Sequence, residues 1–188
     1  MADARFAIEA TPIAGLHVVQ RKRVEDARGF LTRLYCAEDL RAAGFDGPIA
    51  QINHTLTRAA GAVRGMHFQY PPAAEDKYVT CIRGEVLDVA VDLRAGSPTF
   101  LHWHGVVLSP DNARSYFIPK GFAHGFQTLV ADSELLYRQL EAGRDVLATI
   151  AASHPDKRYS VDMLINSRSR TWAGFAAQRL PRPHNRQT

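Results

Sequence analysis

The span of residues 61–77, "GAVRGMHFQYPPAAEDK", places four chemically versatile side chains among apolar neighbours: Arg64, His67, Gln69 and Lys77. A histidine titrates near neutral pH, so His67 can act as a general base. The ammonium group of Lys77 can stabilise a negatively charged oxygen. Removing a proton from a carbon beside a ketone needs these two groups and an acid that returns a proton. The span therefore indicates a candidate proton-transfer site.

A candidate for the acid lies further along the chain, in the segment "ELLYRQ" (134–139). Tyr137 can donate a proton if its phenol group points towards His67 and Lys77. Spacing along strands does not by itself bring the three residues together. A structural histidine, a surface lysine and a core tyrosine are therefore the alternative interpretation of the same residues.

Two motifs also invite a metal-site interpretation. Gly61 and His67 form G-x5-H, and "FIPKGFAHGF" (117–126) contains P-x-G-x-x-H ending at His124. These motifs are similar to the two half-motifs of the cupin barrel. Metal cupins need an H-x-H pair and an acid, but here the candidate ligands are His67, Gln69 and His124, with Glu75 as the candidate acid. Glutamine is a poor ligand for a transition metal, so we expect no metal and no other cofactor.

A second H-x-H pair, His102 and His104, lies in the segment "TFLHWHGVVLS" (99–109). We expect this segment to be a strand, which would place both histidines on one face. No third ligand is suggested nearby, so a solvated strand face is the preferred interpretation.

The elements that must position these residues are short strands. Segment 84–94 alternates Leu87, Val89, Val91 and Leu93 with Val86, Asp88, Ala90 and Asp92. Segments 99–109, 113–121 and 133–142 predict three more strands, separated by turn-forming residues. A short helix is expected over 37–44, ending at Gly44. Strands at spacings of about ten residues predict an all-β, antiparallel jelly-roll barrel with few helices.

Composition limits the class of protein. The chain has 188 residues, 46% of them hydrophobic, a formal charge of +4 and a pI of about 9.3. We expect one domain over 1–175 and a flexible tail over 176–188. The mildly basic charge favours an anionic ligand, but the basic residues are too scattered to indicate nucleic-acid binding.

The location of the protein is also an inference from sequence. No signal peptide is recognised at the amino terminus, and no apolar run is long enough to span a membrane. Cys36 and Cys81 do not have metal-site spacing, so we expect two buried free thiols in a reducing compartment, with a disulfide as the alternative. We therefore expect a cytoplasmic protein.

An ordered set of segments resembles the dTDP-4-dehydrorhamnose 3,5-epimerase family of metal-free cupins. The segments run in family order over about residues 20–140. They are "DARGF" (26–30), "QINHT" (51–55), "VRGMHFQYPP" (63–72), "KYVTCIRGEVLDVAVDLRAGSPTF" (77–100), "LSPDN" (108–112), "IPKGFAHGFQTL" (118–129) and "ELLYR" (134–138).

This resemblance implies a jelly-roll homodimer that acts on a nucleotide-linked 4-keto-6-deoxy sugar. Carbon 3, or carbons 3 and 5, would be inverted through an enolate. By the same resemblance His67 is the base, Lys77 the enolate-stabilising cation and Tyr137 the acid. The positions implied to line the substrate pocket are Arg28, Phe30, Gln51, Asn53, Arg64 and His124.

Two departures from the family pattern leave alternatives open. The segment "INSRSRTWAGF" (165–175) aligns Ser169 with the aspartate that usually pairs with the catalytic histidine, and Arg33 stands where the family commonly has glutamate. A serine can orient an imidazole but supplies no negative charge. The alternatives are a weakened or inactive sugar-nucleotide binding homologue and a 3,4-ketoisomerase on the same scaffold. The nucleotide, the sugar and the number of inverted carbons are not determined by the sequence.

Overall fold

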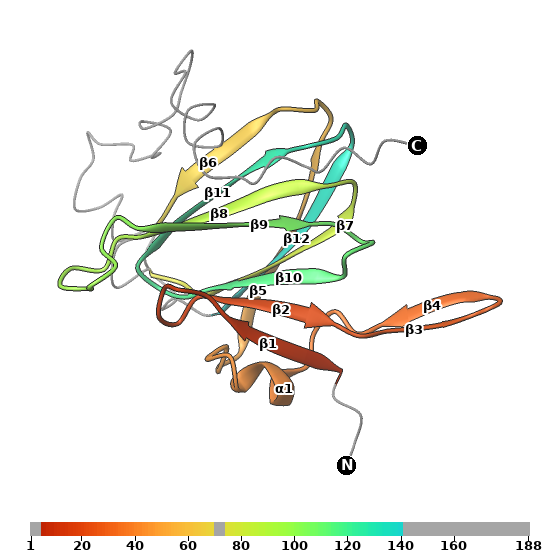
Figure 1. Cartoon of the computed structure of the whole chain (residues 1–188), viewed down its shortest axis with the longest axis horizontal. Helices are drawn as coiled ribbons and strands as arrows, with labels where there is room; N and C mark the ends of the chain where they lie inside the picture. Colours follow the sequence, from red (N-terminus) through yellow and green to blue (C-terminus); the bar gives the residue numbers. More distant parts are fainter. Residues whose placement is uncertain (1–4, 70–73, 141–188) are drawn as a thin grey trace, which may run out of the picture.

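Two antiparallel sheets face each other in the computed structural model, which describes residues 5–69 and 74–140 (Figure 1). The larger sheet has the strand order β1-β2-β10-β7-β12-β5, and the smaller has the order β6-β11-β8-β9. Strands β3 and β4 form a separate hairpin. The elements are β1 (Phe6–Ala10), β2 (His17–Arg21), β3 (Arg23–Asp26), β4 (Gly29–Thr32), α1 (Ala37–Arg41), β5 (Ile49–Thr57), β6 (Val63–His67), β7 (Lys77–Arg83), β8 (Val86–Asp92), β9 (Trp103–Leu108), β10 (Arg114–Ile118), β11 (Phe122–Thr128) and β12 (Ser133–Leu140).

The predicted all-β jelly-roll class is therefore confirmed, and the predicted strands need only small adjustments. Strands β8, β10 and β12 fall within the predicted segments, although residues 141–142 lie outside the described part of the chain. The helix stops at Arg41 and continues as a turn to Gly44, which has a φ of +89°. The expected domain end at residue 175 and the tail over 176–188 also lie outside the described residues.

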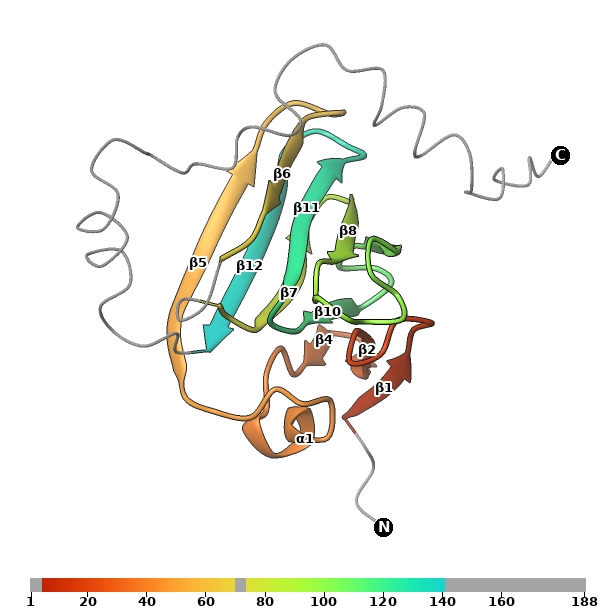
Figure 2. The same cartoon turned by 90° about the vertical axis from the view of Figure 1, so that its left-hand side faces the viewer.

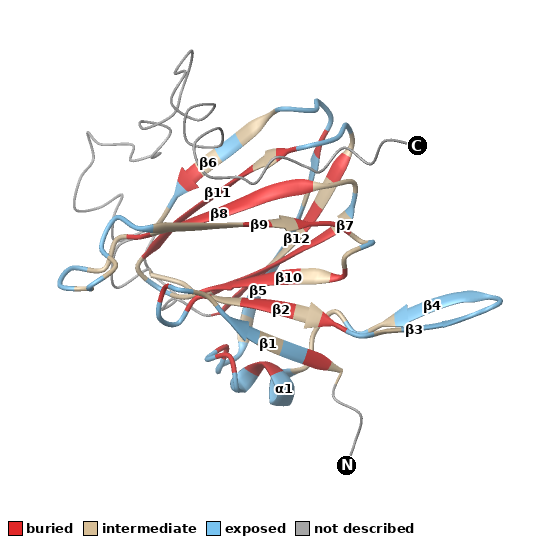
Figure 3. Ribbon diagram, in the orientation of Figure 1, coloured by how far each residue is buried: buried red, intermediate tan, exposed pale blue. Residues whose placement is uncertain are grey.

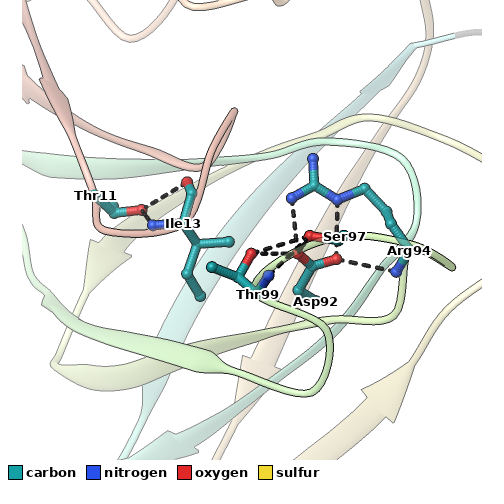
Figure 4. Close-up of polar contacts among 6 residues, drawn as sticks. All are labelled: Thr11, Ile13, Asp92, Arg94, Ser97 and Thr99. Carbon is teal, nitrogen blue, oxygen red and sulfur yellow. Dashed lines mark hydrogen bonds and ion pairs between the residues drawn. The ribbon is translucent and has the colours of Figure 1, made fainter.

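The largest difference is at the start of β9, which begins at Trp103 rather than at Thr99. The hydroxyl groups of Ser97 and Thr99 each lie 2.7 Å from Oδ2 of buried Asp92, and Arg94 binds both oxygens of the same carboxylate (Figure 4). These hydrogen bonds hold the chain in a turn, because serine and threonine side chains compete with regular strand pairing.

The apolar core has two parts, one on each side of the larger sheet. The first fills the space between the sheets and includes Val79, Ala90, Tyr116 and Phe126. The second lies between the outer face of the larger sheet and α1 (Figure 2), and its members are Phe6, Val19, Leu40, Ala43, Phe45, Tyr78, Phe117 and Leu140. Colouring by burial shows the central strands buried and the β3–β4 hairpin exposed (Figure 3). Apolar packing on both faces of the larger sheet thus supports the strands that carry the site.

Candidate active site

A cavity of about 860 Å³ is lined by residues on or next to β5, β6, β7, β11 and β12. This size suits a small organic ligand. Its lining is mixed polar and aromatic: Asn53, His54, Thr55, Val63, Arg64, Gly65, His67, Phe68, Gln69, Glu75, Lys77, His124, Gly125, Phe126, Tyr137 and Gln139. His67, Lys77 and Tyr137, which are far apart in sequence, therefore line the same space.

Close contact between β6 and β11 places two of the histidines. His67 pairs with His124 in the register of these strands. A Cβ atom on Gly65 would lie 2.5 Å from the Cα of Gly125, and one on Gly125 would lie 2.9 Å from the carbonyl oxygen of Arg64. Only glycine at both positions allows the backbones to approach so closely. The glycines thus bring the two histidines to one wall of the cavity.

Lys77 is the first residue of β7 and is buried, with its side chain 11% exposed. Its Nζ lies 3.2 Å from Oε1 of Glu75, which is 7% exposed. Gln139 on β12 pairs with Lys77 in the register of the sheet. A buried ammonium needs such a partner, because removal from water is costly for an isolated charge.

Tyr137 lies on β12 between β5 and β7, paired with Asn53 on one side and Val79 on the other. Its ring meets the imidazole of His124 edge-on, with centroids 6.0 Å apart. Burial raises the pKa of the Tyr137 phenol above its ordinary value, and the negative charge of Asp88 adds to this effect. The phenol is therefore protonated at neutral pH and able to donate.

Asp88 is a site residue that the sequence analysis did not single out. Its side chain has no exposed surface, and Oδ1 lies 2.7 Å from Nε2 of His124. Burial raises the pKa of the Asp88 carboxyl, and the nearby His124 and Lys77 oppose this rise. Asp88 thus holds the imidazole of His124 from behind the cavity wall.

The amide side chains expected near the substrate form a connected group. Oε1 of Gln139 accepts hydrogen bonds from Nδ2 of Asn53, at 3.0 Å, and from Nε2 of Gln51. Nε2 of Gln139 donates to Oε1 of Glu75 at 2.9 Å. Asn53 and Gln139 line the cavity, whereas Gln51 reaches it only through Gln139. Arg64 also lines the cavity, from the exposed side of β6.

Comparison with known proteins agrees with this arrangement. The sequence profile of the dTDP-4-dehydrorhamnose 3,5-epimerase family matches residues 10–175. The chain belongs to this family. A family enzyme of Sinorhizobium fredii is 38% identical over 130 residues, which are 69% of this chain and 67% of that protein. In the first curated relatives the match spans about two thirds of their length.

Solved structures of family enzymes have the same fold. The enzyme of Bacillus anthracis, with TDP and pyrophosphate bound, superposes with a TM-score of 0.71 at 34% identity and covers 86% of this chain and 92% of its own. The enzyme of Legionella pneumophila, in complex with dTDP-4-keto-L-rhamnose, superposes with a TM-score of 0.70 at 37% identity and covers 75% and 74%.

Besides Gln51, two more of the residues expected by family resemblance do not line the cavity of this chain. Arg28 and Phe30 lie on the β3–β4 hairpin, which projects from the sheets (Figure 1). The Arg28 side chain instead pairs with Asp26, with Nη2 2.6 Å from Oδ2. Phe30 is 54% exposed and lies under the guanidinium of Arg23. Sequence motifs identify residue types, but they do not tell where the fold places them.

Ser169 lies outside the described residues. Among the described residues, no three His, Cys, Asp or Glu side chains come together as a metal site. His102 lies just before β9 and is exposed, so the H-x-H pair is not on one strand. His104 bonds to the Tyr116 hydroxyl at 2.8 Å.

In the described part of the chain no helix is long and apolar enough to cross a membrane. Cys36 and Cys81 are free thiols, as predicted, but only Cys81 is buried and Cys36 is partly exposed.

Proposed function

We propose that this protein epimerises a dTDP-linked 4-keto-6-deoxy sugar at C3, or at C3 and C5, without a cofactor. The observation that supports this most is the convergence of His67, Lys77 and Tyr137 from three strands on one cavity. Family membership and the solved complex of a relative with dTDP-4-keto-L-rhamnose support the substrate class. Epimerisation changes no oxidation state, so proton transfer alone completes the reaction.

The proposed reaction has two proton transfers at each carbon that it inverts. His67 takes the proton from the carbon beside the C4 ketone, and the electron pair moves onto the ketone oxygen as an enolate. The Lys77 ammonium stabilises this oxygen, because a fixed positive charge in a partly dry cavity interacts strongly with a developing anion. Tyr137 then returns a proton to the opposite face of the carbon. Solvent exchange restores the protonation of His67 and Tyr137 after each turnover.

The amide group and Arg64 supply binding rather than chemistry in this proposal. Asn53 and Gln139 offer donors and acceptors for sugar hydroxyls, and Gln51 holds Gln139 in place through its hydrogen bond. Arg64 offers a planar guanidinium suited to paired contacts with diphosphate oxygens. His124, fixed by Asp88, faces the same cavity and contributes a further polar contact to the sugar.

We further propose that the enzyme is a cytoplasmic homodimer in which the β3–β4 hairpin enters the partner's site. An isolated two-stranded hairpin is marginally stable in water, and this one exposes Val24, Phe30 and Leu31 by 46–71%. Burial of such large apolar groups against a second copy is favourable. Arg28 and Phe30 would then reach a substrate bound by the other chain.

The test of the activity is incubation with dTDP-4-keto-6-deoxyglucose in deuterated water, followed by mass spectrometry and NMR. Deuterium at C3, or at C3 and C5, with inverted configuration is the expected result. Replacing the base, as His67→Asn, should slow labelling by about 10²- to 10⁴-fold. Absence of label from the wild-type protein, with this and related nucleotide sugars, would refute the proposal.

A further inference from the structure

Glu75, which lies two residues before β7, has three polar contacts through one carboxylate oxygen. Its Oε1 lies 3.2 Å from Nζ of Lys77 and accepts hydrogen bonds from Nε2 of Gln69 at 3.1 Å and of Gln139 at 2.9 Å. A carboxylate oxygen only accepts, so three donors are turned towards one point. The side chain is 7% exposed and lines the cavity.

The contacts of Glu75 connect four parts of the cavity wall. Gln69 follows β6, Lys77 begins β7, and Gln139 lies on β12. Through Gln139 the contacts continue to Asn53 on β5, whose Nδ2 lies 3.0 Å from Gln139 Oε1. A change in the position of this single carboxylate would therefore shift the side chains that contact it and, through Gln139, that of Asn53.

We propose that Glu75 is a positioning residue that holds the Lys77 ammonium where the enolate oxygen forms; this rests on the function proposed above. A lysine side chain has a flexible four-carbon stem, and its ammonium has three donors. The contact with Glu75 uses one donor and fixes the direction of the others. Displacement of a catalytic group by about 1 Å can slow a reaction by about 100-fold. The position of the carboxylate therefore governs the rate.

If Glu75 acted through its negative charge instead of its position, removing that charge would have the opposite effect on the rate. The carboxylate neutralises part of the ammonium charge, so removing it would strengthen the attraction of Lys77 for the enolate and speed the reaction. Because the three contacts of Glu75 all involve Oε1, they can survive in Glu75→Gln, which loses only the charge. Glu75→Asp keeps the charge but withdraws the carboxylate by one methylene group.

The experiment compares kcat and KM of these two variants with the wild type in the deuterium-labelling assay. We expect kcat to fall by about 10- to 100-fold in Glu75→Asp and by less than about fivefold in Glu75→Gln, with smaller changes in KM. Asp76→Asn is the matched control. Asp76 is the adjacent acid, its Oδ1 accepts from the backbone N–H of Lys120 at 2.8 Å, and it is not among the cavity-lining residues. It should leave kcat unchanged.

A double-mutant cycle tests whether Glu75 acts through Lys77. In a Lys77→Met background, Glu75→Asp should slow exchange by less than about twofold, since coupled residues are not additive. An equal or larger loss in that background, or a Glu75→Asp enzyme faster than Glu75→Gln, would overturn the inference.

Crystal structures of the wild type and Glu75→Asp give a readout that does not depend on activity. A displaced Lys77 ammonium is expected in the variant, and an unmoved one would overturn the inference. A wild-type enzyme that labels no substrate would instead refute the proposed function, so the two failures are distinguishable.

Discussion

Nε2 of His124 lies 2.7 Å from Oδ1 of Asp88, behind the wall of the cavity and almost wholly removed from solvent. The second oxygen of Asp88, Oδ2, has no hydrogen-bond partner among the described residues. A buried carboxylate in this situation depends on its one strong partner. The same contact therefore stabilises the interior of the barrel and fixes the orientation of the His124 imidazole, which lines the cavity.

Asp88→Ala is expected to lower the free energy of unfolding by about 1–3 kcal/mol, because it leaves the buried imidazole without its hydrogen-bond partner. Urea unfolding of the purified protein measures this change. The control is Asp111→Ala, an exposed acid whose loss should change stability by no more than about 0.5 kcal/mol. Equal stability of Asp88→Ala and the wild type would show that the pair does not support the fold.

Asp88 also shows what alternation in a sequence can and cannot predict. The pattern of residues 86–92 predicts a strand correctly, and β8 fills that range. It does not say which face is inside. The face of β8 that carries the acids is fully buried, because none of its side chains has exposed surface: Val86, Asp88, Ala90 and Asp92. Barrels that hold a polar site direct charged side chains inward, which a rule of apolar residues inside does not foresee.

The site itself was predictable in part. Family motifs named His67, Lys77, Tyr137 and His124, and all four line one cavity. The contacts of Glu75 depend on Gln139, which is 64 residues away, and no local pattern encodes such a pairing. Likewise the start of β9 depends on hydrogen bonds from Thr99 to Asp92 rather than on strand propensity.

Replacing the acid, as Tyr137→Phe, should separate the two halves of the reaction. The ring and its packing against His124 are kept, but the phenolic proton is lost. Inversion should slow by about 10²- to 10⁴-fold, while exchange of the sugar proton with solvent, which requires only His67 and Lys77, should continue. NMR of the recovered sugar distinguishes label with retention from label with inversion. Loss of both exchange and inversion in a folded variant would contradict the assignment of Tyr137 as the acid.

The same residue predicts part of the pH dependence. Burial raises the pKa of Tyr137 above its ordinary value of 10.0, so the phenol stays protonated as the pH rises to that value. Titration of Tyr137 should therefore not lower the wild-type kcat below about pH 9. Any fall in kcat below that pH should also be seen in Tyr137→Phe. A limb near neutral pH that disappears in this variant would show that Tyr137 titrates in that range.

Complementation between inactive variants tests the proposed exchange of hairpins. If Arg28 acts in the partner's site, Arg28→Ala and His67→Asn are each deficient, but a mixed dimer contains one site with both residues intact. Random mixing makes half of the dimers mixed, so about one quarter of the wild-type activity should return. Mixing either variant with itself is the control. No recovery, with mixed dimers demonstrated by native mass spectrometry, would place Arg28 in its own chain's site or outside both.

The hydrogen bonds of Asp92 predict the acid sensitivity of the fold. The guanidinium of Arg94 and the hydroxyl of Ser97 hold the pKa of the Asp92 carboxyl well below its ordinary value (Figure 4). A depressed pKa in the folded state means that the stabilisation is fully present above about pH 5 and is lost as the pH falls. Asp92→Asn should therefore cost about 2–3 kcal/mol at pH 7, and the difference from the wild type should begin to shrink near pH 4 and keep shrinking as the pH falls below 3. Urea unfolding at each pH measures both quantities, with exposed Asp46→Asn as the control. A difference that stays constant with pH would mean that the turn is held by neutral contacts and not by the carboxylate.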